Sequence, residues 1–283
     1  MPIENVSDTA RWVAVYRAME TARPDAIFRD PFAERLAGER GHQIVREIKQ
    51  GRQAAWAMIV RTAVLDELIL DRIANGGVDT VINLAAGLDT RAWRLALPPS
   101  LQWFDVDLPA ITAYKAEAMR GEKPVCRYEA IPADLTSEST RNEVLRRVAG
   151  VARTALVVTE GLLVYLSREQ VESLARALHA HPSIRWWVND IASPRLLEWM
   201  TKSWGKNVAK GNAPFQFAIA DSAAFFAALG WRERENRFGM DEAHRLKREM
   251  RGMWLFRLIT RLTSGVNREE MRRMTSYLLL ERA

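Results

Sequence analysis

Three acidic residues stand where short apolar segments of the sequence end: Asp107, Asp134 and Glu160. If these segments are parallel strands, their carboxyl ends form one edge of a sheet, where ligands of open α/β folds bind. Asp107 could accept hydrogen bonds from both hydroxyls of a ribose, or could instead cap the helix that follows Pro109. Asp134 could accept one from an adenine amino group, with Leu135 against the ring. Glu160 is expected to be partly desolvated and unpaired, so a cationic group such as an α-amine would stabilise it.

Gly87 and Arg61 add a loop and a cation to these carboxylates. Gly87 is the one glycine in the loop of residues 83–91, where its tolerance of positive φ would let the backbone approach a cofactor. A dinucleotide fingerprint needs three glycines there, which disfavours a nicotinamide-dependent oxidoreductase. Arg61 has only apolar neighbours three and four residues away on its predicted helix. Its guanidinium must therefore meet a carboxylate from elsewhere, either on a ligand or in a tertiary salt bridge.

The elements that position these residues follow from hydrophobic periodicity. A helical extension is expected over about 1–76, with a turn at 29–31 and a long helix from about Arg52 to the glycines at 76–77. Short apolar runs then alternate with helices such as Ser167–His179, which Ser167 and Gln170 open with a capping box. This alternation predicts a mostly parallel α/β sheet with helices on both faces. The predicted strands are Thr80–Ala85, Gln102–Val106, Val125–Ile131, Ala155–Thr159, Ile184–Asn189, Trp231–Phe238 and Ser276–Glu281.

Two irregular helical segments, about 193–221 and 240–275, are predicted beside the carboxyl ends of the strands. They could form a lid over an apolar ligand, or their rings could be ordinary core. No repeat or low-complexity linker interrupts the chain, so residues 1–283 are expected to form one domain. The aromatic residues of the two segments are Trp199, Trp204, Phe215, Phe217, Trp254 and Phe256.

Composition narrows the class of protein. The net charge of +6 comes from basic residues that are spread along the chain without a run of five, which favours a solvated surface over nucleic-acid binding. The lone Cys126 excludes an internal disulfide and fits a reducing compartment, and four histidines do not suggest a metal cluster. No apolar stretch approaches the roughly 20 residues that span a bilayer, and residues 1–4 lack a signal pattern. A cytoplasmic protein without metal, membrane or nucleic-acid partner is expected.

Several ordered motifs together resemble the leucine carboxyl methyltransferase family. They are Val81–Arg91, Asp105–Pro109 and Thr159–Leu166, with further similarity at Tyr16–Glu20 and residues 30–31. The pattern is most similar to the bacterial branch that resembles the tetracenomycin polyketide O-methyltransferase, closely over about residues 10–170 and loosely beyond. This resemblance implies a Rossmann-like class I methyltransferase with a seven-stranded sheet, S-adenosyl-L-methionine as cofactor and S-adenosyl-L-homocysteine as product.

The resemblance also implies a role for each candidate residue. The family usually has glycine where this chain has Ala85, so an extra methyl group is expected near the cofactor. The implied contacts are Arg61 to the cofactor carboxylate with help from Arg17, Ala85 and Gly87 in the loop, Asp107 to the ribose, Asp134 and Leu135 to the adenine, and Glu160 to the methionine end.

The expected reaction is methyl transfer to an oxygen of a small apolar acceptor, aromatic or polyketide-like, as in secondary metabolism. A carboxylate is ionised at neutral pH, whereas a phenol with a pKa near 10 needs a base. No histidine falls beside a predicted strand end, which favours a carboxylate, although His42 or His244 could reach the site through the fold. Tyr165 could orient the acceptor or be merely packed.

Three other functions remain open at this point: a carboxyl methyltransferase acting on a protein, a nucleic-acid methyltransferase, and a cofactor-binding protein without catalysis. The sequence does not indicate the acceptor or the oligomeric state.

Overall fold

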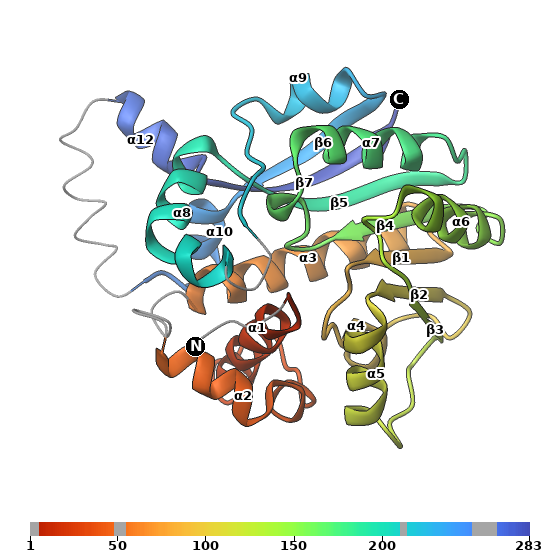
Figure 1. The fold of residues 1–283 in the computed structure, drawn as a ribbon, viewed down its shortest axis with the longest axis horizontal. Helices are drawn as coiled ribbons and strands as arrows, with labels where there is room; N and C mark the ends of the chain where they lie inside the picture. Colours follow the sequence, from red (N-terminus) through yellow and green to blue (C-terminus); the bar gives the residue numbers. More distant parts are fainter. Residues whose placement is uncertain (1–5, 48–54, 210–213, 251–264) are drawn as a thin grey trace.

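A seven-stranded mixed sheet forms the centre of the computed structural model, which describes residues 6–47, 55–209, 214–250 and 265–283 (Figure 1). The strand order is β3-β2-β1-β4-β5-β7-β6. The first five strands pair in parallel, and β7 is antiparallel to both β5 and β6. The predicted seven-stranded, mostly parallel sheet is confirmed. The strands are β1 (Thr80–Leu84), β2 (Gln102–Asp107), β3 (Arg127–Pro132), β4 (Ala155–Thr159), β5 (Ile184–Ala192), β6 (Trp231–Phe238) and β7 (Thr275–Arg282).

Helices cover both faces of this sheet, as expected for strands joined by crossover connections. One face packs against α6 (Glu138–Ala149), α7 (Arg168–His179) and α9 (Ser222–Ala227). The other packs against α3 (Ala55–Asn75), α4 (Arg91–Arg94) and α10 (Gly239–Arg245). All residues of β1 and β4 are buried, so these two strands form the middle of the core. The remaining helices are α1 (Val6–Thr21), α2 (Ala33–Glu47), α5 (Pro109–Ala118), α8 (Pro194–Ala209), α12 (Gly265–Arg272) and the 3₁₀ turn η2 (Leu163–Tyr165).

The predicted start of α7 is confirmed. Ser167 accepts a hydrogen bond from the Gln170 backbone, and the Gln170 side chain accepts one from the Ser167 backbone. This capping box satisfies two N–H groups that the first turn of a helix leaves without partners.

Seven of the predicted strand limits differ from the structure, five of them by one residue. β1 ends at Leu84 instead of Ala85, because Ala85 has a left-handed φ of +53° that no strand residue adopts. β3 begins at Arg127 instead of Val125, after a turn. β5 continues to Ala192 because its pairing with the antiparallel β7 extends over residues 190–192, beyond the last β4 partner at Asn189.

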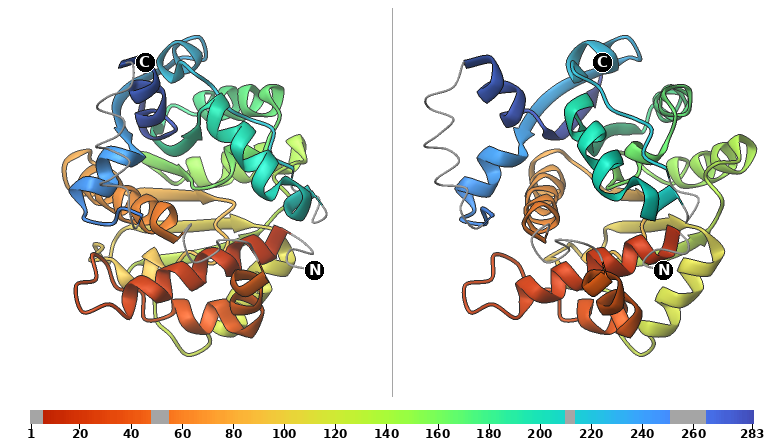
Figure 2. Two further views of the ribbon diagram at one scale, coloured as in Figure 1. Left: turned by 90° about the vertical axis from the view of Figure 1, so that its left-hand side faces the viewer. Right: turned by 60° about the vertical axis from the view of Figure 1, so that its left-hand side comes forward.

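The N-terminal helices form a separate layer. α1 and α2 pack against each other and against the start of α3, and Figure 2 shows them at the bottom of both views, away from α9 and the C-terminus. Near the predicted turn at 29–31 the structure has a turn over residues 30–33, in which the Ala33 N–H donates to the Asp30 carbonyl at 3.2 Å. The expected start of the long helix at Arg52 lies outside the described residues.

Both predicted lid segments contain helices in their described parts. Trp199 and Phe215 line a cavity, described below, whereas Phe217 is buried in the core. Trp204, Trp254 and Phe256 lie outside the residues whose side chains are described. No described helix is both long and apolar enough to cross a bilayer.

Candidate functional site

A cavity of about 690 Å³ opens at the carboxyl ends of the parallel strands. Its lining comes from α1 and α3 on one side, from the loops after β1, β2 and β4, and from α8, α10 and α12. Its size and position are typical of a small-molecule site in an α/β fold. The sequence-predicted residues that line it are Arg17, Arg61, Ala85, Gly87, Asp107, Glu160 and Tyr165.

The loop after β1 is held by Asp107. The Gly87 backbone N–H donates to Asp107 Oδ2 at 2.6 Å, and the Leu108 N–H donates to Oδ1 at 2.7 Å. Burial raises the pKa of Asp107 above its ordinary value, although these two bonds oppose the shift. Gly87 has a φ of +53°, and a Cβ there would lie 3.2 Å from the Cβ of Ala10. Each Asp107 oxygen keeps a lone pair for a further donor, so the carboxylate can hold the loop and a ligand hydroxyl together.

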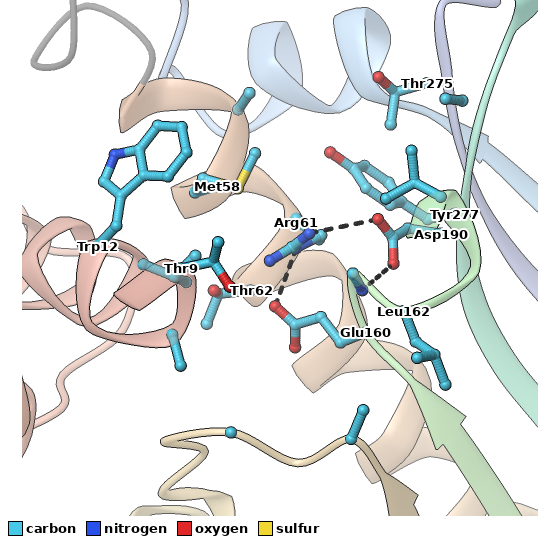
Figure 3. Close-up of a pocket in the computed structure, with 18 of the residues that line it drawn as sticks. Thr9, Trp12, Met58, Arg61, Thr62, Glu160, Leu162, Asp190, Thr275 and Tyr277 are labelled. Carbon is cyan, nitrogen blue, oxygen red and sulfur yellow. Dashed lines mark hydrogen bonds and ion pairs between the residues drawn. The ribbon is translucent and has the colours of Figure 1, made fainter. Parts of the chain in front are cut away.

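Arg61 lies between two carboxylates (Figure 3). Its Nε donates to Glu160 Oε1 at 2.9 Å and its Nη1 to Asp190 Oδ2 at 3.3 Å. The tertiary salt bridge that the sequence left open is therefore present. Burial by itself lowers the pKa of Arg61, but Asp190 and Glu160 raise it by more, so the guanidinium stays charged. Gly161 leaves room for it, because a Cβ at Gly161 would come within 2.9 Å of Nη1.

Glu160 has a second arginine partner. Arg91 Nη1 donates to Glu160 Oε2 at 2.7 Å, so the expectation of an unpaired carboxylate was wrong. Burial opposes ionisation, but Arg91 and Arg61 outweigh it and hold the pKa of Glu160 below its usual range. The missed partner follows the β1 loop at the start of α4, and no local pattern of the sequence pairs it with Glu160.

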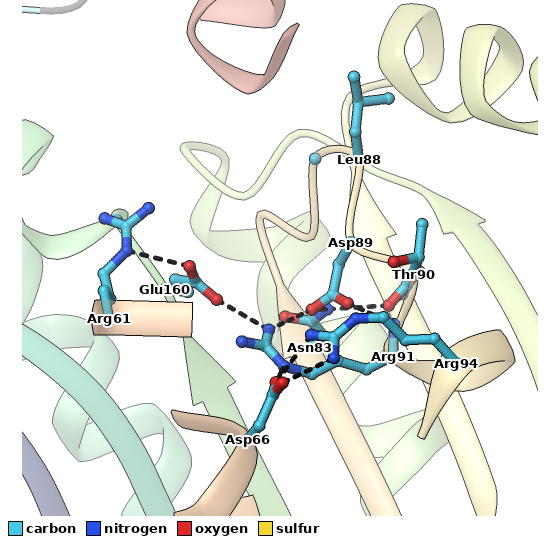
Figure 4. Close-up of polar contacts among 12 residues, drawn as sticks. Arg61, Asp66, Asn83, Leu88, Asp89, Thr90, Arg91, Arg94 and Glu160 are labelled. Carbon is cyan, nitrogen blue, oxygen red and sulfur yellow. Dashed lines mark hydrogen bonds and ion pairs between the residues drawn. The ribbon is translucent and has the colours of Figure 1, made fainter. Parts of the chain in front are cut away.

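Arg91 joins Glu160 to a wider network of ion pairs (Figure 4). Its Nε donates to Asp66 on α3 at 2.6 Å, and its Nη1 also contacts Asp89. Arg94 makes two further bonds to Asp66, at 2.6 and 2.8 Å. These contacts hold α3, α4 and the loop after β4 together. The charged residues that line this part of the cavity form its charged wall.

Arg17 braces the same loop from α1. Its Nε donates to Asp30 Oδ2 at 2.7 Å and its Nη2 to the Leu88 carbonyl at 2.6 Å. Asp30 also accepts a bond from Thr90 Oγ1 at 2.7 Å. These contacts show that Arg17 stabilises the loop after β1. A direct contact of Arg17 with the cofactor remains a prediction.

Asp134 and Leu135 do not line the cavity in this structure. Asp134 is exposed, and its Oδ1 accepts bonds from the Thr136 N–H at 2.9 Å and the Thr136 hydroxyl at 2.7 Å. Their contact with an adenine ring remains a prediction.

Asp190 is a functional candidate that the sequence analysis missed. The predicted strand stopped at Asn189, whereas the side chain of Asp190 faces the cavity from the continuing β5. Its Oδ1 accepts a bond from the Gly161 N–H at 2.6 Å. Asp190 directly follows the predicted strand, so the strand-end rule that selected Asp107 and Glu160 would also have selected it.

Tyr165 lies at the boundary between the charged and apolar parts of the lining. Its ring stacks on Phe215, with centroids 5.5 Å apart and planes 29° apart. Burial raises the pKa of Tyr165 to about 12, against a hydrogen bond with Thr9 and the charge of Arg61. The hydroxyl is therefore neutral at physiological pH and can donate a hydrogen bond.

The part of the lining from α8, α10 and α12 is apolar. Among the described lining residues, those within 196–200, 215, 239–250 and 271–277 include no charged side chain and no histidine. His42 pairs with Glu34 on α2, and His244 does not line the cavity either. Methionine is a flexible side chain that adapts to irregular ligand shapes. Six of the ten methionines of the chain line the cavity: Met58, Met200, Met240, Met250, Met271 and Met274.

Sequence and structure comparisons agree on the kind of protein. Residues 10–179 match the leucine carboxyl methyltransferase family. A proposed S-adenosyl-L-methionine-dependent methyltransferase of Streptomyces coelicolor is 35% identical over 178 residues, which are 59% of this chain and 62% of that protein. One of Frankia alni is 36% identical over 183 residues, 61% of this chain and 63% of that protein. The matched stretch thus spans less than two thirds of each relative.

Two solved structures share the fold. A proposed methyltransferase from Thermobifida fusca YX aligns with a TM-score of 0.63 at 13% identity, over 100% of this chain and 96% of its own. A DUF574 family protein from Streptomyces avermitilis MA-4680 aligns with a TM-score of 0.62 at 12% identity, over 95% and 97%. The expected Rossmann-like methyltransferase fold is confirmed. With its family match covering residues 10–179, this chain belongs to the leucine carboxyl methyltransferase family.

Proposed function

We propose that this chain is an S-adenosyl-L-methionine-dependent O-methyltransferase that methylates a small apolar acceptor and releases S-adenosyl-L-homocysteine. The observation that carries the proposal is the division of one cavity into a charged wall at the strand ends and an uncharged wall of aromatic and methionine side chains. The first suits a charged cofactor, and the second suits an apolar acceptor beside it.

The donors and acceptors of the charged wall fit the cofactor. An α-amino acid end needs a cation for its carboxylate and an anion for its ammonium group, and Arg61 and Glu160 stand 2.9 Å apart. A ribose needs an acceptor for its hydroxyls, and Asp107 has lone pairs to spare. Ala85 and Gly87 have positive φ angles, which turn the loop after β1. The main chain of this loop, and no long side chain from these two residues, therefore lies next to the proposed cofactor.

When bound, S-adenosyl-L-methionine supplies an activated methyl group, so the protein has mainly to align the acceptor and exclude water. Arg61, Glu160 and Asp107 hold the cofactor in place. Tyr165 donates a hydrogen bond to the acceptor oxygen, which belongs to a carboxylate or a phenolic hydroxyl. The apolar wall holds the acceptor body, for which an aromatic or polyketide-like metabolite of the cytoplasm is the best match.

The test is methyl transfer from labelled cofactor into an extract of small molecules and macromolecules. The proposal predicts that the label enters the solvent-extractable fraction and that S-adenosyl-L-homocysteine binds in calorimetry. Label on protein or nucleic acid would instead support a macromolecular acceptor. Binding of S-adenosyl-L-homocysteine without any labelled product would support a binding protein that lacks catalysis.

A further inference from the structure

The uncharged wall of the cavity contains two hydroxyl groups, and both come from β7. Among the described lining residues within 196–200, 215, 239–250 and 271–277, only Thr275 and Tyr277 carry a hydroxyl. Neither hydroxyl has a hydrogen-bond partner among the residues that the structure describes, and the proposed cofactor contacts use neither of them. Because a polar group without a partner costs free energy in apolar surroundings, a ligand oxygen that lies here would be bound favourably.

The pairing of β5 with β7 places these hydroxyls in a row that starts at the charged wall. Tyr277 lies opposite Asp190, and Thr275 lies opposite Ala192. Side chains two residues apart on a strand share a face, as do directly opposite residues, so all four point to the same side of the sheet. All four line the cavity. The row therefore leads from Asp190 and Tyr277 into the uncharged wall at Ala192 and Thr275.

Small residues leave room beside the two hydroxyls. Gly239, the first residue of α10, lines the cavity and has no left-handed φ, so its backbone conformation does not require glycine. A Cβ at Gly239 would lie 3.4 Å from the Tyr277 hydroxyl oxygen and 3.2 Å from the Thr275 Cβ. Figure 3 shows the Tyr277 hydroxyl pointing from β7 toward the side of the cavity where Met58 lies. Glycine at position 239 and the small Ala192 thus keep a hydroxyl subsite open, formed by Ala192, Gly239, Thr275 and Tyr277.

Both hydroxyls of this subsite are uncharged at physiological pH. Burial raises the pKa of Tyr277, against the charge of Arg61. A neutral phenol and a threonine hydroxyl can each donate one hydrogen bond and accept others. The pair therefore suits an uncharged oxygen group of a ligand, either a hydroxyl or a carbonyl.

On the basis of the proposed function, we infer that the acceptor carries a hydroxyl or keto group in addition to the oxygen that is methylated, and that Tyr277 and Thr275 bind this second group. The acceptor is thus an oxygenated apolar compound, such as an aromatic acid with a hydroxyl on its ring. The hydroxyl subsite determines specificity, because an analogue without the second group leaves both hydroxyls without a partner. Tyr165, on η2, remains the donor to the methylated oxygen.

A matched set of ligands tests the inference without turnover. 2-Naphthoate and its monohydroxy derivatives, with the hydroxyl at each position of the second ring, share one aromatic acid and differ in a single group. Each is titrated by calorimetry into protein saturated with S-adenosyl-L-homocysteine. We expect at least one hydroxy derivative to bind at least about fivefold more tightly than 2-naphthoate, the order expected for one buried hydrogen bond.

Variants of the subsite should remove this preference. It should fall below about twofold in Tyr277→Phe, which keeps the ring and loses only the hydroxyl, and it should weaken in Thr275→Val. It should persist in the control Tyr114→Phe, whose hydroxyl donates to the Leu36 carbonyl at 3.0 Å and does not line the cavity. Affinity for S-adenosyl-L-homocysteine should change by less than about twofold in Tyr277→Phe and Thr275→Val, which also shows that both variants are folded.

The outcomes separate the two proposals. If S-adenosyl-L-homocysteine fails to bind the unaltered protein, the proposed function is wrong. If it binds but no hydroxy derivative is preferred over 2-naphthoate, or either subsite variant keeps the full preference, the inference about the hydroxyl subsite is overturned and the proposed function is unaffected. A loss of affinity for S-adenosyl-L-homocysteine in Tyr277→Phe by about tenfold or more would assign this hydroxyl to the cofactor and would also overturn the inference.

Discussion

The two walls of the cavity are built on different principles. The charged wall consists of ion pairs between elements far apart in the chain, such as Arg61 with Asp190 across 129 residues and Arg91 with Glu160 across 69. Each partner fixes the position of the other, so geometry there is specified before any ligand arrives. The uncharged wall consists of methionine and aromatic side chains whose contacts are non-directional and adaptable. Under the proposed function, the charged wall recognises the cofactor by charge, and the uncharged wall accepts the acceptor by shape.

The largest effect should come from breaking the charged wall at its centre. Arg91→Met should lower the free energy of unfolding by about 3–5 kcal/mol, because it strands Asp66, Asp89 and Glu160 without their shared cation. Urea denaturation measures this. The control Arg273→Met, whose side chain is 57% exposed, should change stability by less than about 0.5 kcal/mol. Equal effects of the two substitutions would show that the network does not brace the fold.

Lowering the pH should weaken the ion pairs of the charged wall. Arginines lower the pKa of Glu160 and Asp89 in the folded state, so these carboxylates stabilise the fold above their unfolded pKa near 4. That stabilisation is lost as the pH falls through the lower, folded values. The free energy of unfolding should therefore decrease below about pH 4, and less steeply in Glu160→Gln. A slope that Glu160→Gln leaves unchanged would exclude Glu160 from the effect.

Cofactor affinity should depend on the charged wall alone. Arg61→Ala and Asp107→Ala should each weaken binding of S-adenosyl-L-homocysteine by more than about tenfold, because each loses a charge-assisted hydrogen bond. Calorimetry measures the affinity, and Arg153→Ala, at a side chain that is 90% exposed, serves as the control. Wild-type affinity in either cavity variant would contradict its assigned role.

Substitutions in the uncharged wall should change only the affinity for the acceptor. Phe215→Ala removes the ring that stacks on Tyr165 and should weaken binding of an aromatic carboxylate such as 2-naphthoate by about threefold to tenfold, in line with the loss of one aromatic contact. Affinity for S-adenosyl-L-homocysteine should change by less than about twofold. If both affinities fell together, the two walls would not be separate recognition surfaces.

The smallest effect concerns Ala85, at the edge of the charged wall. Its φ of +53° costs an L-residue about 1 kcal/mol, whereas glycine adopts it freely. Ala85→Gly should therefore leave stability unchanged or raise it by up to about 1 kcal/mol, since greater freedom of the unfolded chain offsets part of the gain. The adjacent Ala86→Gly has no such strain to relieve and should destabilise by about 0.4–1 kcal/mol. Equal losses in both variants would argue against strain at Ala85.

The sequence predicted the parts of the site that depend on local pattern. Short apolar runs located the strand ends, which brought Asp107, Glu160 and Gly87 into one cavity. The partners of these residues could not be predicted in the same way. Glu160 meets Arg91 and Arg61 only because α3 and α4 lie on the same face of the sheet, and such tertiary pairing leaves no periodic signal in the sequence.

Two other features show a different limit of prediction from the sequence. Asp190 directly follows the predicted strand Ile184–Asn189, so the sequence pattern did indicate it, but its contacts with Gly161 and Arg61 are visible only in the structure. Ala85 was recognised as a departure from the family pattern, but its left-handed backbone is visible only in the structure. Asp134 and Leu135 show the reverse case, since a strand-end position alone did not place them in the cavity lining.

The central claim is that the charged wall binds an adenosyl amino acid, and a crystal structure of the protein with S-adenosyl-L-homocysteine tests it most directly. We predict that the ligand carboxylate lies on Arg61, its ammonium group on Glu160 and its ribose hydroxyls on Asp107. A ligand bound elsewhere, or an Arg61 that keeps both carboxylate partners while the ligand touches neither Glu160 nor Asp107, would contradict the account.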